Sequence, residues 1–450
     1  MKRILFALML VAIFFGSLFS QKAQVKNPLV AKMINEVSEK NLRQIIEKLV
    51  SFGTRHTLSD TISTSRGIGA ARRWIKSEYE RYAAQSSGRM TVEFHETVIP
   101  PSARVPNPAK VVNVVATLKG RDAGTPRERI LVVGGHYDTR ASGANDVEAD
   151  APGANDDGSG TALAMELARV LSKYEFDATI VFIAFAAEEQ GLLGAQAWAE
   201  MAKRNKWNVE AVLNNDMVSS TVAGDGTKEN KYIRVFSEAF APQDTGAVLR
   251  QKISQGLEND GGSRSLARYI KEVGERYVPK FEVKLVYRLD RFGRGGDHRP
   301  FHERGFAAVR FCEPKENYDH QHQNIRTENE KEYGDLVKFI DFQYFTKVTK
   351  VNGAVLATLA LAPAPPVNVR MSTQQSYDTN LRWNHVPSSN PAGYLVRYRE
   401  TSSAFWQHAL FTTDTTLTVK AHKDDFLFGV QAIDGKGNGS LIVVPKVGAR

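Results

Sequence analysis

The sequence predicts an α/β protein with a mostly parallel mixed sheet, followed by a separate β-sandwich. The first observation is a set of short, almost wholly apolar runs that alternate with helical patterns between residues 110 and 216. Strands that are apolar on both faces are typical of parallel sheets covered by helices on each side. The second observation is a change to period-two alternation after residue 366, which is typical of the short, half-buried strands of a sandwich.

Helical periodicity is the first regular pattern along the chain. The stretch NLRQIIEKLVSF places Leu42, Ile45, Ile46 and Leu49 on one face, and GIGAARRWIKSEYERY is a second amphipathic run. Strands are then predicted at VVNVVATL, RILVVGG, ATIVFIAFA and VEAVLNNDM, with helices at GSGTALAMELARVLSK and LLGAQAWAEMAKR between them. Residues 219–295 are expected to form an elaboration that narrows access to a site.

The predicted boundaries divide the chain into four parts. A basic start followed by an apolar run from Ile4 to Phe15 has the layout of a secretory signal peptide, which we assign to residues 1–20. Residues 21–360 form the α/β domain, 361–366 (LAPAPP) a linker, and 367–450 the sandwich. We therefore expect a secreted or periplasmic protein with no stable membrane insertion after cleavage.

Composition excludes two further classes of protein. The formal net charge is +9, but the basic residues are scattered and no aromatic-interleaved basic patch exists, so nucleic-acid binding is not expected. Cys312 is the one cysteine, which excludes a disulfide framework. Its place in the apolar stretch AAVRFCE favours a buried structural role over a nucleophilic one.

Acidic residues and a histidine gather where predicted strands end or a helix begins. The carboxyl ends of the strands form the ligand crevice of an open α/β sheet. Carboxylates crowded in this way stay ionised only beside positive charge, and oxygen-rich sites with few imidazoles suit pairs of divalent cations. The sequence therefore predicts a metal site, where one of two adjacent glutamates can hold metal while the other handles protons. The residues are His136 and Asp138 in GGHYDTR, Asp156 and Asp157 in GANDDGSG, Glu188 and Glu189 in AAEEQGLLG, and Asp216 in NNDM.

These motifs, followed by GGDHRPFHERGFAAVRF, resemble in their order the M28 family of zinc aminopeptidases over roughly residues 40–350. The resemblance implies a phosphorylase/hydrolase-like three-layer α/β sandwich with two co-catalytic Zn²⁺ ions. It also implies that His136 and Asp216 ligate one zinc, that Glu189 ligates the other, and that Asp156 bridges both.

Two catalytic roles follow from the same resemblance. Glu188 would be the general base that takes a proton from the attacking water. Asp138 would hydrogen-bond the second nitrogen of His136 and hold its tautomer. In the Gly-rich loop GGDHRPF, His298 is expected to shape the pocket or support the loop rather than to bind metal.

The last metal ligand is where the sequence departs from the family pattern. The stretch ENYDHQHQNIRTE offers two histidines and lacks the aspartate that the family places after its ligand. Alignment on Thr327 favours His322, whereas alignment on Tyr318 favours His320. We prefer His322 and keep His320 as the alternative.

The expected function is the hydrolysis of N-terminal residues from peptide substrates by an exported di-zinc exopeptidase. Three alternatives stay open: a metallocarboxypeptidase, a glutaminyl cyclase on the same scaffold, and a non-catalytic receptor-like or adhesive protein. Trp383 and the strand GYLVRY resemble a fibronectin type III domain. Such modules bind or space, so a surface or polymer partner of this module is a further expectation.

Overall fold

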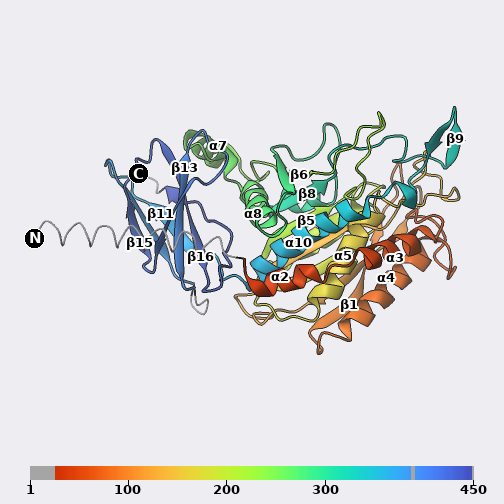
Figure 1. The fold of residues 1–450 in the computed structure, drawn as a ribbon, viewed down its shortest axis with the longest axis horizontal. Helices are drawn as coiled ribbons and strands as arrows, with labels where there is room; N and C mark the ends of the chain where they lie inside the picture. Colours follow the sequence, from red (N-terminus) through yellow and green to blue (C-terminus); the bar gives the residue numbers. More distant parts are fainter. Residues whose placement is uncertain (1–25, 387–390, 448–450) are drawn as a thin grey trace, which may run out of the picture.

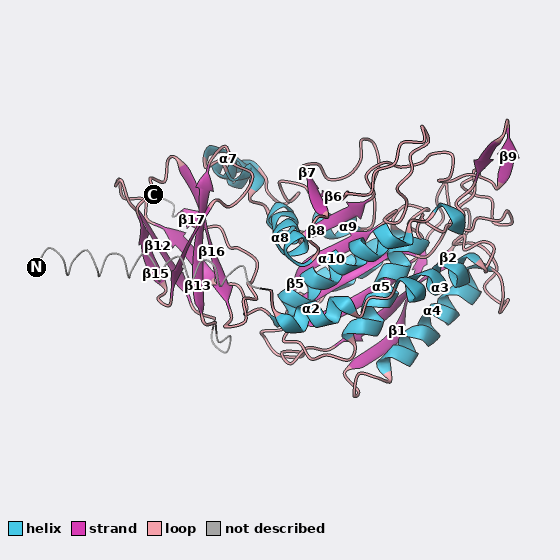
Figure 2. Ribbon diagram, in the orientation of Figure 1, coloured by secondary structure: helices cyan, strands magenta, loops and turns pink. Residues whose placement is uncertain are grey.

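The computed structural model describes residues 26–386 and 391–447, so the predicted signal peptide at residues 1–20 lies outside the described residues. One large sheet with helices on both faces accounts for most of the chain up to residue 361, and two smaller sheets follow (Figures 1 and 2). Within the described ranges, every helix is too short or too polar to cross a bilayer.

The large sheet has eight strands in the order β1-β2-β4-β3-β5-β8-β6-β7. The pairs β3/β4, β3/β5, β5/β8 and β6/β7 are parallel and the other pairs are antiparallel, which is the mostly parallel mixed sheet that the sequence predicts. Every residue of β3 and β4 is buried, which explains their unbroken apolar runs. The strands are β1 (Met90–Ile99), β2 (Ala109–Leu118), β3 (Ile130–His136), β4 (Thr179–Phe185), β5 (Val209–Asn215), β6 (Tyr232–Phe236), β7 (Glu282–Val286) and β8 (Ala308–Cys312).

Helices cover both faces of this sheet and create two cores. The smaller core lies under α6 (Leu193–Arg204) and α9 (His298–Glu303), where Phe301 packs on both Phe185 of β4 and Trp198 of α6. The larger core fills the opposite face, and the two together make three layers. The helices of the larger core are α2 (Pro28–Asn35), α3 (Glu39–Val50), α4 (Gly67–Ala83), α5 (Gly158–Leu171), α8 (Gly262–Tyr277) and α10 (Phe342–Leu361).

Two regions differ from the sequence-based expectation. The stretch 219–295, expected to be an elaboration, supplies β6 and β7 at one edge of the main sheet and the buried face of α8. The N-terminal region, where the sequence shows helical periodicity, also contains a strand, β1, at the opposite edge of the sheet. The residues of β1 mostly alternate between exposed and partly buried. Edge strands bury one face only, so their polar residues hide the signal that the central strands display. The shorter α7 (Gly246–Ser254) and a 3₁₀ turn (Leu257–Asn259) lie in the same region.

The C-terminal part consists of a four-stranded and a three-stranded sheet, in the orders β15-β12-β11-β17 and β14-β13-β16. Trp383, Tyr394, Val396 and Phe428 form its separate core. The strands are β11 (Val367–Met371), β12 (Thr379–Asn384), β13 (Gly393–Glu400), β14 (His408–Thr412), β15 (Thr416–Val419), β16 (Phe426–Ile433) and β17 (Lys446–Val447). A small hairpin of β9 (Arg326–Glu328) and β10 (Lys331–Tyr333) projects at the other end of the molecule (Figure 1).

Buried ion pairs join the C-terminal sheets to the α/β part. The carboxylate of Asp260 lies 2.5 Å from Arg268 Nη2 of α8 and 2.8 Å from Arg399 Nη2 of β13. The three side chains, which we call the interface cluster, are each no more than 2% exposed. Beside them the Tyr269 hydroxyl donates a 2.7 Å hydrogen bond to the Gly439 carbonyl. The two parts are therefore connected through a desolvated contact.

Candidate metal centre

The residues singled out by the sequence converge at the carboxyl ends of the central strands. His136 is the last residue of β3, Asp216 directly follows β5, and Glu188 and Glu189 follow β4 by three and four residues. Asp156 stands two residues before α5, which begins where the chain returns from β3. Parallel neighbours in the sheet order β4-β3-β5 bring these strand ends to one place, as an open α/β sheet requires.

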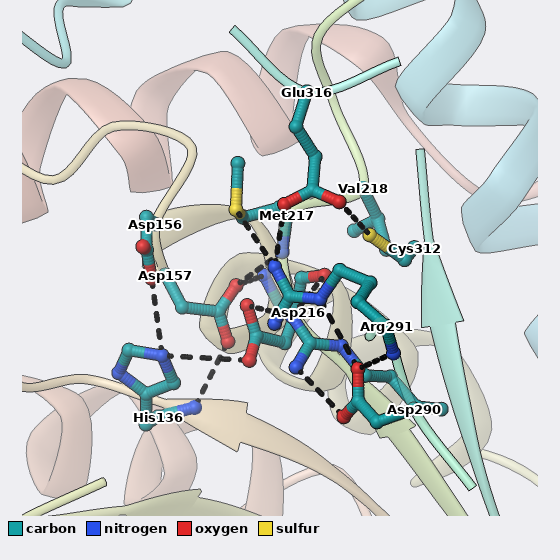
Figure 3. A network of polar contacts seen from close by, with 12 residues as sticks. His136, Asp156, Asp157, Asp216, Met217, Val218, Asp290, Arg291, Cys312 and Glu316 are labelled. Carbon is teal, nitrogen blue, oxygen red and sulfur yellow. Dashed lines mark hydrogen bonds and ion pairs between the residues drawn. The ribbon is translucent and has the colours of Figure 1, made fainter. Parts of the chain in front are cut away.

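Asp156 lies between two pairs of candidate metal ligands. Its Oδ1 is 3.2 Å from His136 Nε2, which is 3.8 Å from Asp216 Oδ2 (Figure 3). Its Oδ2 is 3.0 Å from His322 Nε2, which is 2.7 Å from Glu189 Oε1. Each oxygen of one carboxylate therefore faces a different histidine and acid, which is the arrangement expected of a residue shared between two ions.

Asp157 has a different role, although it also lies beside His136 and Asp216. It caps α5: its Oδ1 accepts a 2.7 Å hydrogen bond from the Gly160 N–H, and its Oδ2 accepts one of 2.9 Å from the His136 N–H. Both oxygens of Asp157 are thus used by the backbone, whereas the carboxylate of Asp156 faces both histidines. The peptide bond between Asp156 and Asp157 is cis.

Asp138 is placed differently from the role that the family resemblance implies. The oxygen within hydrogen-bond reach of His136 Nδ1 is the Asp138 main-chain carbonyl, at 3.1 Å, while the carboxylate is 3.6 Å away. That carboxylate instead accepts the backbone N–H groups of Glu188 and Glu189, each at 3.2 Å. Asp138 therefore orients the turn that presents both glutamates, and its carbonyl faces the histidine.

His322, rather than His320, lies in the acid cluster. The ring of His320 is stacked on Phe339 with centroids 3.6 Å apart, away from the candidate ligands. Between the two, Gln321 donates a 2.7 Å hydrogen bond from Nε2 to Asp156 Oδ2. Sequence reasoning missed Gln321, because an amide in a loop carries no signal of its own.

Buried groups from distant segments hold the loop that carries Asp156. Asp335 accepts the N–H of Asn155 at 2.9 Å and the N–H of Asp156 at 2.7 Å. Arg55, 1% exposed, donates to the carbonyls of Tyr137 at 2.6 Å and Gly153 at 2.9 Å. Arg55 and Asp335 are both far from this loop in sequence, so motif spacing alone could not reveal that they hold it.

Asp216 has one oxygen paired within the protein and one left for the site. Arg310 Nη2 lies 2.8 Å from Asp216 Oδ1, and Arg310 Nη1 lies 3.2 Å from Asp290 Oδ2. Arg291 continues the network to Asp290 and Glu316 (Figure 3). Buried arginines thus fix the orientation of Asp216 while its Oδ2 faces His136.

The remaining sequence candidates are structural. His298 is buried and its Nε2 lies 2.8 Å from the Leu289 carbonyl, so it supports the loop before α9. Cys312 is fully buried, and burial raises the pKa of its thiol to about 12, which removes it as a nucleophile. Asp297, from the same loop GGDHRPF, is 1% exposed, and neither carboxylate oxygen has a hydrogen-bond partner in the described ranges.

The acids of the centre strongly affect one another's protonation. Burial, followed by repulsion from Glu189 and Asp216, raises the pKa of Glu188 well above its usual range. Burial lowers the pKa of His322, but attraction to Glu189 and Asp156 outweighs it and raises that pKa to about 10. The site therefore attracts positive charge, whether as protons or as cations.

Divalent cations fit this donor set. Glu189 Oε1 is buried and has no hydrogen-bond partner in the described ranges, although His322 Nε2 lies 2.7 Å from it. Once the imidazole has lost its proton, its nitrogen and the carboxylate oxygen both have lone pairs available for a shared ion. Two imidazoles and three carboxylates match the mixed N/O ligand sets that zinc takes.

A pocket of about 310 Å³ opens onto the cluster, so solvent and small molecules reach it. Glu188 is partly exposed there, whereas Glu189 is buried. The described residues that line the pocket are Arg104, Arg140, Asp156, Glu188, Glu189, Gly191, Leu192, Asp216, Arg291, Arg294, Gly295, Gln321 and His322.

Comparison with known proteins identifies the class. The model of peptidase family M28 matches residues 113–340, a range that contains every candidate ligand. A relative from Leptosphaeria maculans is 44% identical over 418 residues, covering 92% of this chain and 96% of its own. One from Pyricularia oryzae is 43% identical over 431 residues, covering 94% and 85%. Each relative is named a probable zinc metalloprotease. The chain belongs to peptidase family M28.

Solved structures share the fold at lower identity. The LapA aminopeptidase of Legionella pneumophila superposes with a TM-score of 0.52 and 22% identity, covering 75% of each chain. An aminopeptidase from Aneurinibacillus sp. strain AM-1 has a TM-score of 0.50 and 16% identity, covering 74% of this chain and 96% of its own. At this identity the likeness concerns the fold.

Proposed function

We propose that this protein is an exported, zinc-dependent exopeptidase that removes N-terminal residues from peptides. His136 and Asp216 would ligate one ion, Glu189 and His322 the other, and Asp156 both. The observation that carries the proposal is the position of Asp156, whose two oxygens face the two separate pairs at 3.2 and 3.0 Å. The names of the curated relatives support zinc as the metal.

The two zinc ions would supply Lewis-acid polarisation of the scissile carbonyl and a lowered pKa for the attacking water. The chain's own contribution to hydrolysis is the movement of a proton. Glu188 takes the proton from water at a carboxylate oxygen and passes it to the leaving amine. Its partial exposure to the pocket lets a water molecule reach its carboxylate, as a general base requires.

Asp138 positions this base. By accepting the N–H groups of both Glu188 and Glu189, it fixes the turn so that one side chain faces the pocket and the other faces His322. Adjacent residues of a turn that point in different directions can divide the two tasks between them. This division of roles explains why two glutamates stand side by side after β4.

Trimming from the N-terminus is favoured by the acidic floor of the pocket. A free α-ammonium group can pair there with the carboxylate of Glu188, which is not a proposed metal ligand, whereas a blocked terminus cannot. The fold neighbours described as aminopeptidases point the same way. We further propose the division into residues 21–360, 361–366 and 367–450, with a fibronectin type III-like module at the end.

The proposal is tested with zinc-loaded protein and matched peptides that carry free or acetylated N-termini. We expect free peptides to be shortened from the N-terminus and acetylated ones to resist, as followed by mass spectrometry. The Glu188→Gln variant should lose this activity, while Glu200→Gln, an exposed glutamate on α6, should keep it. Shortening from the C-terminus would assign a carboxypeptidase instead, and no cleavage would favour a binding protein.

A further inference from the structure

Arginines surround the mouth of the pocket whose floor holds the acid cluster. Arg104, Arg140, Arg291 and Arg294 all line it. They come from three different loops: the one between β1 and β2, the one after β3, and the one between β7 and α9. Cationic side chains from separate segments that meet at one opening indicate a built feature rather than the chance composition of one loop.

Three of the four arginines retain unused hydrogen-bond donors. Arg104 Nη1 donates to the Glu189 carbonyl at 2.6 Å, and Arg140 makes only long contacts of 3.3–3.4 Å to neighbouring carbonyls. In the described part of the chain, the Arg294 guanidinium makes no hydrogen bond or ion pair. Arg291, in contrast, is committed to Asp290 and Glu316.

The charge of the occupied site follows from this arrangement. Two divalent cations would balance the four carboxylates that line the pocket, so the arginines set the sign of the potential at its mouth. Leu192 is the single apolar side chain among the described lining residues, so charged and polar side chains supply most of the specific contacts. Arginine pairs with carboxylates through two parallel N–H···O bonds, which gives strength and direction.

We propose that Arg104, Arg140 and Arg294 select peptides that present a carboxylate next to the scissile bond. This inference rests on the proposed peptidase function and specifies its substrate class. The carboxylate has two possible sources: an acidic side chain at the N-terminal residue, or the free C-terminus of a very short peptide. Both present the same planar anion to the guanidinium groups.

The side-chain source is tested with Asp-Gly-Gly-amide against Asn-Gly-Gly-amide, and the terminal source with Asn-Gly-Gly as free acid against its amide. We expect kcat/KM to favour the carboxylate partner of at least one pair by roughly tenfold, the ratio for a charge-assisted hydrogen bond. The preference should shrink as salt is raised, because the arginines are at the surface.

Arginine variants test whether the preference for a carboxylate substrate depends on these side chains. Arg104→Gln, Arg140→Gln and Arg294→Gln should each bring the ratio within a pair towards one, and the triple variant should abolish it. The matched control is Arg370→Gln on β11, an exposed arginine of the C-terminal sheets, which should keep the full ratio. Equal rates within both pairs, or a preference that the triple variant retains, would overturn the inference.

A binding measurement separates this inference from the proposed function. Calorimetry with the zinc-loaded Glu188→Gln variant should give tighter binding of the Asp than the Asn amide, or of the free acid than its amide, and Arg294→Gln should remove the difference. If no peptide is cleaved, the peptidase proposal fails, and this binding difference alone decides the role of the arginines. Equal affinities within both pairs would contradict it.

Discussion

The metal centre and the interface cluster both bury charged side chains, but arginines pair both oxygens of the acid in the interface cluster, whereas the acids of the metal centre greatly outnumber the arginines that contact them. Asp260 contacts both Arg268 and Arg399, and these side chains are at most 2% exposed. In the metal centre, four carboxylates line one pocket, and the buried cation that contacts one of them, Arg310, takes a single oxygen of Asp216.

This difference separates a structural cluster from a functional one. Removing charges from water is expensive, and a chain that pairs them internally obtains a fixed contact between two parts. A chain that leaves acids unpaired among two imidazoles retains a demand for external cations. The same kinds of side chain therefore join the C-terminal sheets in one place and prepare a site for metal in the other.

The largest effect is expected at Glu188, which takes part in the reaction without serving as a proposed ligand. Glu188→Gln keeps the shape of the side chain but cannot accept a proton, so kcat should fall roughly a hundredfold to ten-thousandfold. Zinc content, measured by atomic emission, should stay that of the parent protein. A variant with nearly full activity would remove Glu188 as the base.

Substitutions in the interface cluster should lower the stability of the protein and leave the activity of each folded molecule unchanged. Asp260→Ala leaves two buried guanidinium groups unpaired, so the free energy of unfolding should drop by about 3–5 kcal/mol. Chemical denaturation measures this loss, with Asp424→Ala, whose side chain is 76% exposed, as the control. A loss below about 1 kcal/mol, in the range of surface ion pairs, would show that the contact does not hold the two parts together.

Protons and metal should compete in the metal centre. The pKa of His322 is raised from 6.5 to about 10, so its attraction to Glu189 and Asp156 stabilises the metal-free protein fully below about pH 6.5 and is lost as pH rises towards 10. At pH 7 zinc must displace this proton. Calorimetric zinc titrations in two buffers of different ionisation enthalpy should reveal proton release, and His322→Ala should release fewer protons. Identical heats in both buffers would contradict this.

The smallest effect is expected where the contact between the two parts reaches solvent. Arg397 lies 3.0 Å from Glu272, with side chains 15% and 28% exposed. Arg397→Ala should cost less than about 1 kcal/mol of unfolding free energy, because partly exposed pairs are screened and pay side-chain entropy. A loss as large as that of Asp260→Ala would mean that burial does not distinguish the two ion pairs.

More of the metal centre than of its surroundings could be predicted from the sequence. His136, Asp156 and Asp216 stand beside predicted strands or helices, and the topology of an open sheet then brings them together. His322 lies in an irregular loop, so the choice against His320 needed coordinates. Asp138 illustrates a finer limit, because spacing cannot tell whether its carboxylate or its carbonyl faces His136.

The interface cluster could not be predicted from the sequence. Asp260 and Arg399 are separated by more than a hundred residues, and neither belongs to a periodic or motif-like pattern. A charged residue in a soluble protein is ordinarily exposed, so nothing in the chain marks these as buried. The arginines of the pocket mouth could not be predicted either, because they come from three separate loops that only the fold brings together.

Zinc stoichiometry tests the central claim most directly. Metal analysis of the purified, zinc-saturated and desalted parent protein should give two ions per chain. Asp156→Ala removes the carboxylate that faces both pairs and should reduce the content to less than one ion, while Asp260→Ala should still bind two. A parent protein without zinc, or an Asp156→Ala variant that retains both ions, would contradict the account.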